Sequence, residues 1–379
     1  MTSPLRPIAR RCTLLLVALA CAGAPLAHGA RAPAKAASKA ARAQAPAPAR
    51  QADDDEAQVD FVAWPVVAEF EEQMVRQHGF ERAALDALLA QVRYVDAAVQ
   101  LVKPAPPGKP KNWQAYRARF VEPVRIGAGV AFWNAHAAAL ARAEARYGVP
   151  ADIIVGIIGV ETVYGRNTGR FRVMDVLTTL AFAYPEAPNQ AARMQFFRGE
   201  LENTLLLARQ SKLDPLSLEG SFAGAVGLPQ FMPGSILAYG VDFDNDGIVD
   251  LRASADDAIG SVANYLQQHG WQAGLDGPLV FAADVAPGRA WESALGQGLV
   301  ASFGAAELAA LGAVSSAALP GGRLFGLIEL QNGAQASEYY FATNNFFAIT
   351  QYNRSYFYAM SVIELGQAVR RAREAQGLF

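Results

Sequence analysis

One glutamate stands at the end of an otherwise apolar segment of the chain. Residues 156–169 read GIIGVETVYGRNTG, in which Glu161 follows isoleucine and valine residues. Pro150 suits the first turn of a helix and Gly165 suits its end, so we expect Glu161 in the last helical turn. The helix dipole and the apolar neighbours both disfavour an ionised carboxylate there, which raises its pKa and predicts a general acid. The alternative is a solvent-facing glutamate whose neighbours alone face the core.

A second segment is rich in small residues. Residues 220–235 read GSFAGAVGLPQFMPGS, and glycine at this density lets a backbone fold tightly and approach a ligand closely. Ser221 and Gln230 are the polar side chains of this segment that could face a ligand. The alternative is an ordinary glycine-rich loop between helices.

Alternating carboxylates in residues 242–251, DFDNDGIVDL, resemble a calcium-binding loop. The residues that match early ligand positions of an EF-hand loop are Asp242, Asp244, Asp246, Gly247, Ile248 and Asp250. Ala253 stands where the last ligand, a glutamate, is expected, and the next carboxylates are Asp256 and Asp257. The loop is therefore either longer than usual or a weak site, and the alternative is an acidic turn without a metal.

Aromatic and amide side chains gather in two further segments, ANYLQQHGW and QYNRSYFYAM. They contain Tyr265, Tyr352, Asn353, Tyr356 and Tyr358. Tyrosine rings can stack on sugar faces and amides can bond sugar hydroxyls, so this composition suits carbohydrate binding. The alternative is core packing with locally satisfied hydroxyl groups.

Several other kinds of chemistry find no support in the sequence. His78, His136 and His269 are scattered, and the chain has no HExxH motif, no GxSxG motif and no glycine-rich phosphate loop. Residues 1–52 hold eight of the 33 basic residues and none of the 35 acidic ones, so the remaining body carries a net charge of −10. An acidic body without a basic stripe argues against nucleic acid as a partner.

The first 30 residues have the layout of a secretory signal peptide. A basic start is followed by an apolar run too short to span a membrane and by a small-residue exit. Cleavage after this leader would remove Cys12 and Cys21, whereas cleavage before Cys21 would produce an outer-membrane lipoprotein. Residues 31–58 are rich in Ala, Pro, Lys and Arg and are predicted to form a disordered linker. We expect an exported, periplasmic protein.

The remaining chain has mainly helical periodicity. Apolar residues recur at helical spacing over residues 59–101, 113–147 and 150–270, with glycine- and proline-rich breaks between them. Short strands are predicted later, in GPLVFAADV, RLFGLIEL and EYYFATNNFFAITQ. An amphipathic helix is predicted over residues 355–375. The expected fold class is mostly α (α+β), with a small sheet inserted late.

Taken together, these segments resemble the lytic murein transglycosylase B family, the membrane-bound lytic transglycosylases of glycoside hydrolase family 103. The resemblance rests on GVETVYGRNTG, FFRGELENTLLLAR, DPLSLEGSFAGAVGLPQFMPGS, VDFDNDGIVDL, DAIGSVANYLQQHGW and ITQYNRSYFYAMSV, in family order. It implies a lysozyme-like helical core with a flanking helical domain and a small β domain. The implied boundaries are 59–149 for the helical domain, 150–273 for the catalytic core with its EF-hand-like loop, 274–350 for the β domain, and 351–379 for a C-terminal helix packing back on the core.

The resemblance also implies a reaction. The family cleaves the β-1,4 bond between N-acetylmuramic acid and N-acetylglucosamine and leaves a 1,6-anhydromuramoyl end. An ordinary glycosidase needs two carboxylates, but the acids nearest in sequence to Glu161, Asp152 and Asp175, suit caps or turns. One glutamate suffices if it acts first as acid and then as base on the substrate's own 6-hydroxyl. The alternatives are a muramidase that uses water, an inactive glycan-binding scaffold and a calcium-sensing adaptor.

Further site residues follow from the resemblance, position by position. The positions that match the family's glycan groove are Ser221, Gln230, Tyr265, Tyr352, Asn353, Tyr358 and Arg193. The family's paired arginines are Ala192 and Arg193 in this chain, and a nearby family tyrosine is Phe196. The implied calcium ligands are Asp242, Asp244, Asp246, the Ile248 carbonyl and Asp257, with Asp256 as a rival for the last position.

The resemblance finally sets expectations about cofactors and partners. No cofactor is required for the chemistry, and a structural Ca²⁺ is expected in the loop. The expected partners are peptidoglycan glycan strands and proteins of cell-wall synthesis, without nucleic acid, and the protein is expected to be a monomer.

Overall fold

The structure, a computed structural model, describes residues 59–103, 110–275 and 277–377. The predicted signal peptide, the linker over residues 31–58 and Cys21 lie outside the described residues.

Helices dominate the described residues. The α-helices are α1 (Pro65–His78), α2 (Arg82–Leu89), α3 (Asp96–Val102), α4 (Trp113–Arg117), α5 (Pro123–Ala135), α6 (Ala137–Tyr147), α7 (Ala151–Thr162), α8 (Val173–Phe182), α9 (Gln190–Ser211), α10 (Pro233–Tyr239), α11 (Ala255–Gln268), α12 (Ala305–Ala310), α13 (Asn344–Tyr352) and α14 (Tyr356–Glu374). Short 3-10 helices are η1 (Phe61–Ala63), η2 (Pro215–Ser217) and η3 (Ala290–Ala294). The predicted class, mostly α with a small sheet, is confirmed.

The strands form two antiparallel sheets within the described residues. They are β1 (Phe171–Arg172), β2 (Glu219–Gly220), β3 (Val280–Val285), β4 (Phe303–Gly304), β5 (Ala313–Val314), β6 (Leu324–Asn332) and β7 (Gln335–Ala342). β1 pairs with β2, and the larger sheet has the order β4-β6-β7-β3-β5. The small β1–β2 sheet was not predicted, since its strands have two residues each and carry no alternating pattern.

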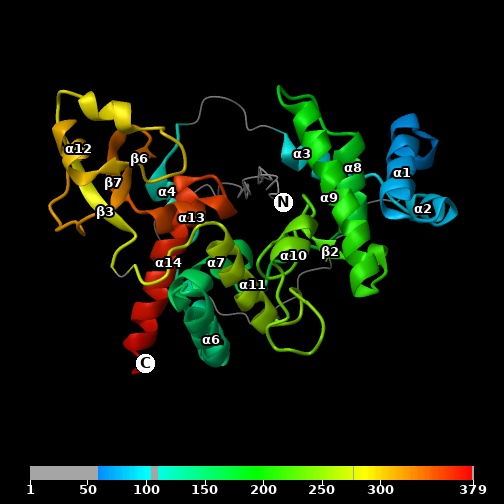
Figure 1. Cartoon of the computed structure of the whole chain (residues 1–379), viewed down its shortest axis with the longest axis horizontal. Coiled ribbons are helices and arrows are strands. Elements are labelled where there is room, and N and C mark those ends of the chain that lie inside the picture. The colour runs from blue at the N-terminus through cyan, green and yellow to red at the C-terminus, as the bar shows by residue number, and fades with distance from the viewer. Residues whose placement is uncertain (1–58, 104–109, 276, 378–379) are drawn as a thin grey trace, which may run out of the picture.

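The two ends of the molecule have different architectures (Figure 1). The larger sheet and α12 lie at one end, whereas α1 and α2 lie at the other, beside α8 and α9. Between these ends lie α6, α7, α11 and the long C-terminal α14. The main hydrophobic core contains buried residues from most of the described chain, the first being Phe61 and the last Val369. A second, smaller core is formed by buried residues of the larger sheet region, the first being Phe281 and the last Phe341. The four predicted domain boundaries remain predictions.

Two glycines bring α7 and α14 into close contact. A Cβ added at Gly156 would lie 2.3 Å from the carbonyl oxygen of Val362, and one at Gly366 would lie 2.2 Å from that of Asp152. Any larger residue would therefore push the helices apart. Since nearly every α7 residue is buried, the helix is apolar on all sides, which is typical of a central core helix.

A slot between α5 and α7 holds the Tyr164 side chain. A Cβ at either Gly129 or Gly159 would lie 2.4 Å from the Tyr164 hydroxyl oxygen. The ring also packs on Phe132, with ring centroids 5.3 Å apart. Tyr164 thus fixes the chain directly after the α7 helix against the neighbouring helix.

The prediction of one strand over residues 338–351 is wrong. β7 ends at Ala342, and α13 begins at Asn344. Aromatic residues favoured a strand, but residues 345–350 are buried without alternation, a pattern that buried helices and buried strands share. Thr343 lies between the strand and the helix. Both its backbone N–H and its hydroxyl donate to the Leu279 carbonyl at 3.0 Å, which fixes the chain at this point.

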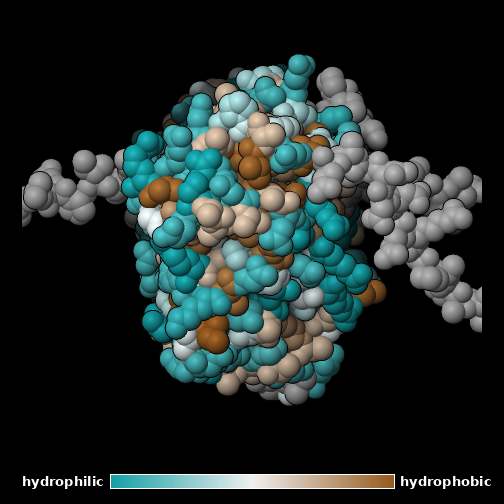
Figure 2. All heavy atoms as spheres, turned by 90° about the vertical axis from the view of Figure 1, so that its right-hand side faces the viewer, coloured by the Kyte–Doolittle hydropathy of each residue, from teal (hydrophilic) through white to brown (hydrophobic). Residues whose placement is uncertain are grey.

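Figure 2 shows the end of the molecule where α1 and α2 lie. Hydrophilic residues cover most of this face, and hydrophobic residues appear among them in small groups. Within the described ranges, no helix combines the length and hydropathy that a membrane crossing requires.

The glycine slot predicts a measurable cost for adding one methyl group. Gly159→Ala places a Cβ against the Tyr164 hydroxyl and 2.8 Å from Leu365 Cδ2, so we expect destabilisation of about 1–3 kcal/mol in urea unfolding. Gly199→Ala on α9 is the matched control, because nothing lies within 4 Å of its added Cβ. The control should be neutral or slightly stabilising. Equal free energies of unfolding for the two variants would contradict the close packing of Tyr164 against Gly159.

Candidate active site

A pocket at the end of α7 gathers the Glu161 side chain with aromatic and amide groups. Its walls come from α4, α5, α7, α9, the glycine-rich loop, the end of α13, the start of α14 and Asn353 between them. The structure places five of the predicted groove residues in this wall, namely Ser221, Gln230, Tyr352, Asn353 and Tyr358. Glu161 therefore faces a pocket and not the open solvent, contrary to the alternative considered from the sequence.

The Glu161 carboxyl group lies in an apolar environment that favours its protonated form. The residue keeps partial contact with solvent, but burial raises the pKa of its carboxyl from 4.5 to about 7. The Tyr358 hydroxyl donates a 2.6 Å hydrogen bond to Oε1 and opposes this rise. Burial likewise raises the pKa of Tyr358 well above its usual value, so its hydroxyl stays a donor. Glu161 can therefore exist as acid and as carboxylate near neutral pH.

The chain turns sharply after Glu161. The predicted helix end at Gly165 is wrong by a few residues, because α7 ends at Thr162 and Val163 forms its C-cap. Val163 and Tyr164 both have left-handed backbones, with φ of 52° and 58°. This conformation is strained for a β-branched residue such as valine. The strain is held in place by the packing of Tyr164 in its slot.

Thr162 connects α7 to the glycine-rich loop. Its buried hydroxyl donates to the Leu228 carbonyl at 2.9 Å and accepts from the Gly165 N–H at 3.0 Å. The Leu228 N–H in turn donates to the Leu251 carbonyl at 2.8 Å. The loop is thereby fixed between α7 and the predicted calcium loop.

The glycine-rich loop presents Ser221 and Gln230 from a rigid backbone. The Ser221 hydroxyl accepts from the Ala225 N–H at 3.0 Å. The Gln230 side-chain amide donates to the carbonyls of Thr168 and Gly227 at 3.1 and 2.9 Å. Gln230 has a left-handed φ of 53°, so a side chain lies where glycine would normally be favoured. These hydrogen bonds fix the loop, so it is not an ordinary flexible linker between helices.

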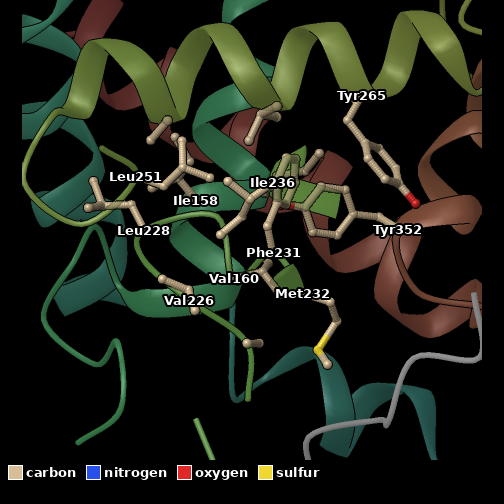
Figure 3. Packing of buried hydrophobic residues seen from close by; sticks show 14 of the residues in the cluster. Ile158, Val160, Val226, Leu228, Phe231, Met232, Ile236, Leu251, Tyr265 and Tyr352 are labelled. Atoms are coloured by element: carbon tan, nitrogen blue, oxygen red, sulfur yellow. The ribbon is translucent and has the colours of Figure 1, made fainter. Parts of the chain in front are cut away.

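Buried aromatic rings pack around Phe231 of the loop (Figure 3). The Phe231 ring lies 5.5 Å from that of Tyr265 and 5.8 Å from that of Tyr352, measured between centroids. The Tyr352 hydroxyl donates to the Pro229 carbonyl, and its ring stacks on Tyr358 at 6.2 Å. Tyr352 thus connects the loop to the tyrosine that holds Glu161.

Two predicted groove residues lie outside the pocket wall. Tyr265 is buried, and its hydroxyl donates to the Gln351 carbonyl at 2.8 Å. Arg193 is also buried, and its guanidinium lies 5.8 and 5.7 Å from the ring centroids of Tyr184 and Phe197. Both side chains therefore support the structure around the pocket, and their role as substrate contacts remains a prediction.

Several lining residues were not predicted from the sequence. Among them are Tyr116, Phe120, Arg125 and Asn167. Tyr116, Phe120 and Arg125 come from the region before residue 150, where helical periodicity carried no recognisable motif. Asn167 lies in the same segment as Glu161, and its amide side chain near the predicted acid is the signal that could have indicated a pocket contact.

The acidic loop brings three carboxylates together. Oxygens of Asp242, Asp244 and Asp257 lie within 4.8 Å of one another. Asp257 is buried and accepts from the N–H groups of Phe243 and Asp250 at 2.7 and 2.8 Å. Burial raises the pKa of Asp257, and the charge of Asp244 adds to the rise.

The other predicted ligands of the loop lie around this cluster. The Asp246 carboxylate accepts from the Ile248 N–H at 2.8 Å, and Ile248 is exposed. Asp256 instead pairs with Arg142 at 2.9 Å. Asp257 is therefore the one of the two rival carboxylates that joins the cluster.

One acid with a pKa near neutrality, beside tyrosine and amide groups, is suited to protonate a glycosidic oxygen, as enzymes that cleave glycosidic bonds do. The chain belongs to the family described as "Transglycosylase SLT domain", whose model matches residues 63–367. The family resemblance predicted from the sequence is confirmed.

Similar proteins support the same membership. The chain is 43% identical over 323 residues to membrane-bound lytic murein transglycosylase B of Escherichia coli K12, covering 83% of this chain and 85% of that protein. It is similar to the catenated lytic transglycosylase SltB1 of Pseudomonas aeruginosa, with 46% identity, a TM-score of 0.75, and coverage of 83% and 100%. It is also similar to E. coli lytic transglycosylase Slt35 in complex with calcium, with 41% identity, a TM-score of 0.73, and coverage of 83% and 96%.

Proposed function

We propose that the protein is a peptidoglycan lytic transglycosylase. It cleaves the β-1,4 bond between N-acetylmuramic acid and N-acetylglucosamine and leaves a 1,6-anhydromuramoyl end. The observation that carries this proposal is a single carboxylic acid in the pocket wall, Glu161, whose burial raises its pKa to about 7. Among the lining residues that the structure describes, Glu161 is the only acid.

The neighbouring acids have structural partners elsewhere. Asp152 pairs with Arg370 at 3.0 Å, at the opposite end of α7. Asp175 pairs with Arg172 at 2.7 Å and accepts from the Arg93 N–H at 3.1 Å. Neither residue lines the pocket, so the two-carboxylate arrangement of an ordinary glycosidase has no second member here.

The reaction then proceeds in two proton transfers. Protonated Glu161 donates its proton to the glycosidic oxygen, and the C1–O bond breaks. The substrate's N-acetyl group stabilises the positive charge at C1. The Glu161 carboxylate next accepts the proton of the muramic acid 6-hydroxyl, whose oxygen bonds to C1. The glutamate ends in its starting state, and the Tyr358 hydrogen bond stabilises the carboxylate in between.

The remaining groove residues bind and orient the glycan. Ser221, Gln230, Tyr352 and Asn353 line the pocket beside Glu161, and they supply hydroxyl and amide groups for sugar hydroxyls and N-acetyl groups. The substrate partner is the peptidoglycan glycan strand. Contacts with proteins of cell-wall synthesis and the monomeric state belong to the same proposal.

The proposed location follows from the substrate and the leader. The similar E. coli protein is named a membrane-bound enzyme. We propose export to the periplasm by the signal peptide over residues 1–30, with a lipid on Cys21 as the alternative form. These segments lie outside the described residues.

A calcium ion suits the acidic loop. The clustered oxygens of Asp242, Asp244 and Asp257 are the hard ligands that Ca²⁺ prefers, and Asp246 and the Ile248 carbonyl lie in the same loop. Bound calcium would neutralise repelling carboxylates and fix the loop to α11, which carries Asp257. The ion would be structural, because none of these residues lines the Glu161 pocket.

Product analysis tests the proposed reaction. Digestion of purified sacculi, followed by mass spectrometry, should yield anhydromuramoyl ends, with activity falling as the pH rises above about 7 and Glu161 loses its proton. Glu161→Gln should lower the rate about a hundredfold or more, whereas the exposed control Glu219→Gln should keep it. Reducing ends would indicate a muramidase, and full cellular function of Glu161→Gln would indicate a scaffold. Either result would overturn the proposal.

Thermal unfolding tests the calcium site. After treatment with a chelator, added Ca²⁺ at a hundredfold excess over its Kd should stabilise the protein by about 2.7 kcal/mol. Asp242→Asn should remove most of this effect. Asp256→Asn is the control, because Asp256 pairs with Arg142 outside the cluster. An unchanged unfolding temperature in the wild type would remove calcium from the account.

A further inference from the structure

The pocket that holds Glu161 also contains one cationic side chain. Among the described residues of its wall, Arg125 is the only lysine or arginine. It comes from α5, close in sequence to Tyr116 and Phe120 but far from the segments that contain Glu161, Ser221 and Tyr358. A cation in a site that binds neutral sugar hydroxyls has no role in the two proton transfers described above. Its charge indicates an anionic group on the substrate.

Local contacts hold Arg125 in place. The Glu122 carboxylate caps α5 and accepts from the N–H groups of Val124 and Arg125, both at 2.7 Å. The Arg125 Nη1 donates to the Arg119 carbonyl at 2.9 Å. Its guanidinium also lies over the Phe120 ring, 5.1 Å from the centroid. The half-buried side chain is therefore ordered before a ligand binds, which lowers the entropic cost of binding.

The arginine that the family resemblance indicated lies elsewhere. Arg193 is buried, its Nε donates to the Tyr184 hydroxyl at 3.3 Å, and it is absent from the pocket wall. The position before it is Ala192, so the second arginine of the family pair is missing. Arg125 thus supplies the positive charge of this pocket from a different helix.

The proposed substrate carries the matching charge. Muramic acid bears a lactyl carboxyl group, which is either free or linked to a peptide stem that has carboxylates of its own. The rest of the glycan is neutral. The body of the protein has a net charge of −10 outside its first 52 residues, which disfavours an anionic polymer in general. A single fixed cation would offset this repulsion at the reacting sugar.

We propose that Arg125 binds a substrate carboxylate, on the muramyl lactyl group or its peptide stem, and so determines which strands are cleaved. This inference rests on the proposed function. The guanidinium fork can donate two parallel hydrogen bonds to a carboxylate, which an ammonium group cannot match. Arg125 is a specificity-determining residue, separate from the acid–base work of Glu161.

The two roles are separable by experiment. Burial and Tyr358 account for the pKa of Glu161, and the charge of Arg125 is not among its causes. Changing Arg125 should therefore raise KM for carboxylate-bearing substrates and leave the pH dependence of kcat in place. A merely structural role would instead lower activity on every substrate alike.

The test compares matched substrates. Stem-bearing strands and amidase-stripped strands, which keep only the lactyl carboxylate, are each prepared in two forms. One form is intact, and in the other the carboxylates are capped as neutral methylamides. The measured quantity is the ratio of kcat/KM for intact over capped substrate. We expect a ratio of about ten or more for the wild type, a ratio near one for Arg125→Gln, and an intermediate ratio for Arg125→Lys.

Controls separate this inference from the proposed function. Arg76→Gln removes an exposed charge on α1, away from the pocket wall, and should keep the wild-type ratio. Loss of the ratio on stem-bearing strands alone assigns the stem carboxylates, and loss on stripped strands alone assigns the lactyl carboxylate. Loss on both shows that Arg125 binds either carboxylate. An unchanged ratio in Arg125→Gln, with both substrates still cleaved, overturns this inference only. Failure of the wild type to cleave either strand overturns the proposed function.

A second measurement uses only the wild type, so it tests the inference even if Arg125→Gln does not fold. Added salt weakens exposed charge interactions, so the wild-type KM should rise with salt on intact strands and stay level on capped strands. Equal salt dependence on both would contradict the role of Arg125 without any substitution.

Discussion

The burial of one carboxyl group, that of Glu161, is the constraint on which the rest of the active site depends. An ionised carboxylate is costly in an apolar environment, so the surrounding packing keeps this acid protonated near neutral pH. The packing is dense because α7 is apolar on all sides and meets α14 through Gly156 and Gly366. α14 also carries Tyr358, the donor that moderates the effect of burial. The helix contact and the acidity of the site therefore have the same origin.

Fixed loops carry the rest of the site. Thr162, next to Glu161, bonds to Leu228, and Leu228 bonds to Leu251 at the end of the acidic loop. The proposed calcium loop is thus two hydrogen bonds away from α7. This connection explains how a structural ion that never touches substrate could still affect the geometry of the pocket. The strained turn at Val163 and Tyr164 fits the same picture, since its cost is offset by packing between α5 and α7.

Part of this site could be predicted from the sequence, and the limits have physical causes. Glu161, Ser221, Gln230 and Tyr358 stand in segments whose glycine, amide and aromatic content is unusual, and the structure brings them to one pocket. Arg125 stands in ordinary helical periodicity, which shows that a helix exists but not which side chain reaches a distant pocket. Tyr265 and Arg193 are in recognisable segments, yet burial directs them into supporting contacts. Residues 344–351 were predicted as strand, although they lie in α13, because buried helices and strands share an unbroken apolar pattern.

The proposed reaction requires that Glu161 is a carboxylic acid with a pKa near neutrality. Infrared difference spectra of the wild type against Glu161→Gln isolate the carboxyl stretch of this one residue, and a pH titration follows its loss. We expect a midpoint at a pH of about 7. A midpoint near the ordinary glutamate value of 4.5 would contradict it, because the residue would then be ionised at neutral pH and could not protonate the leaving oxygen.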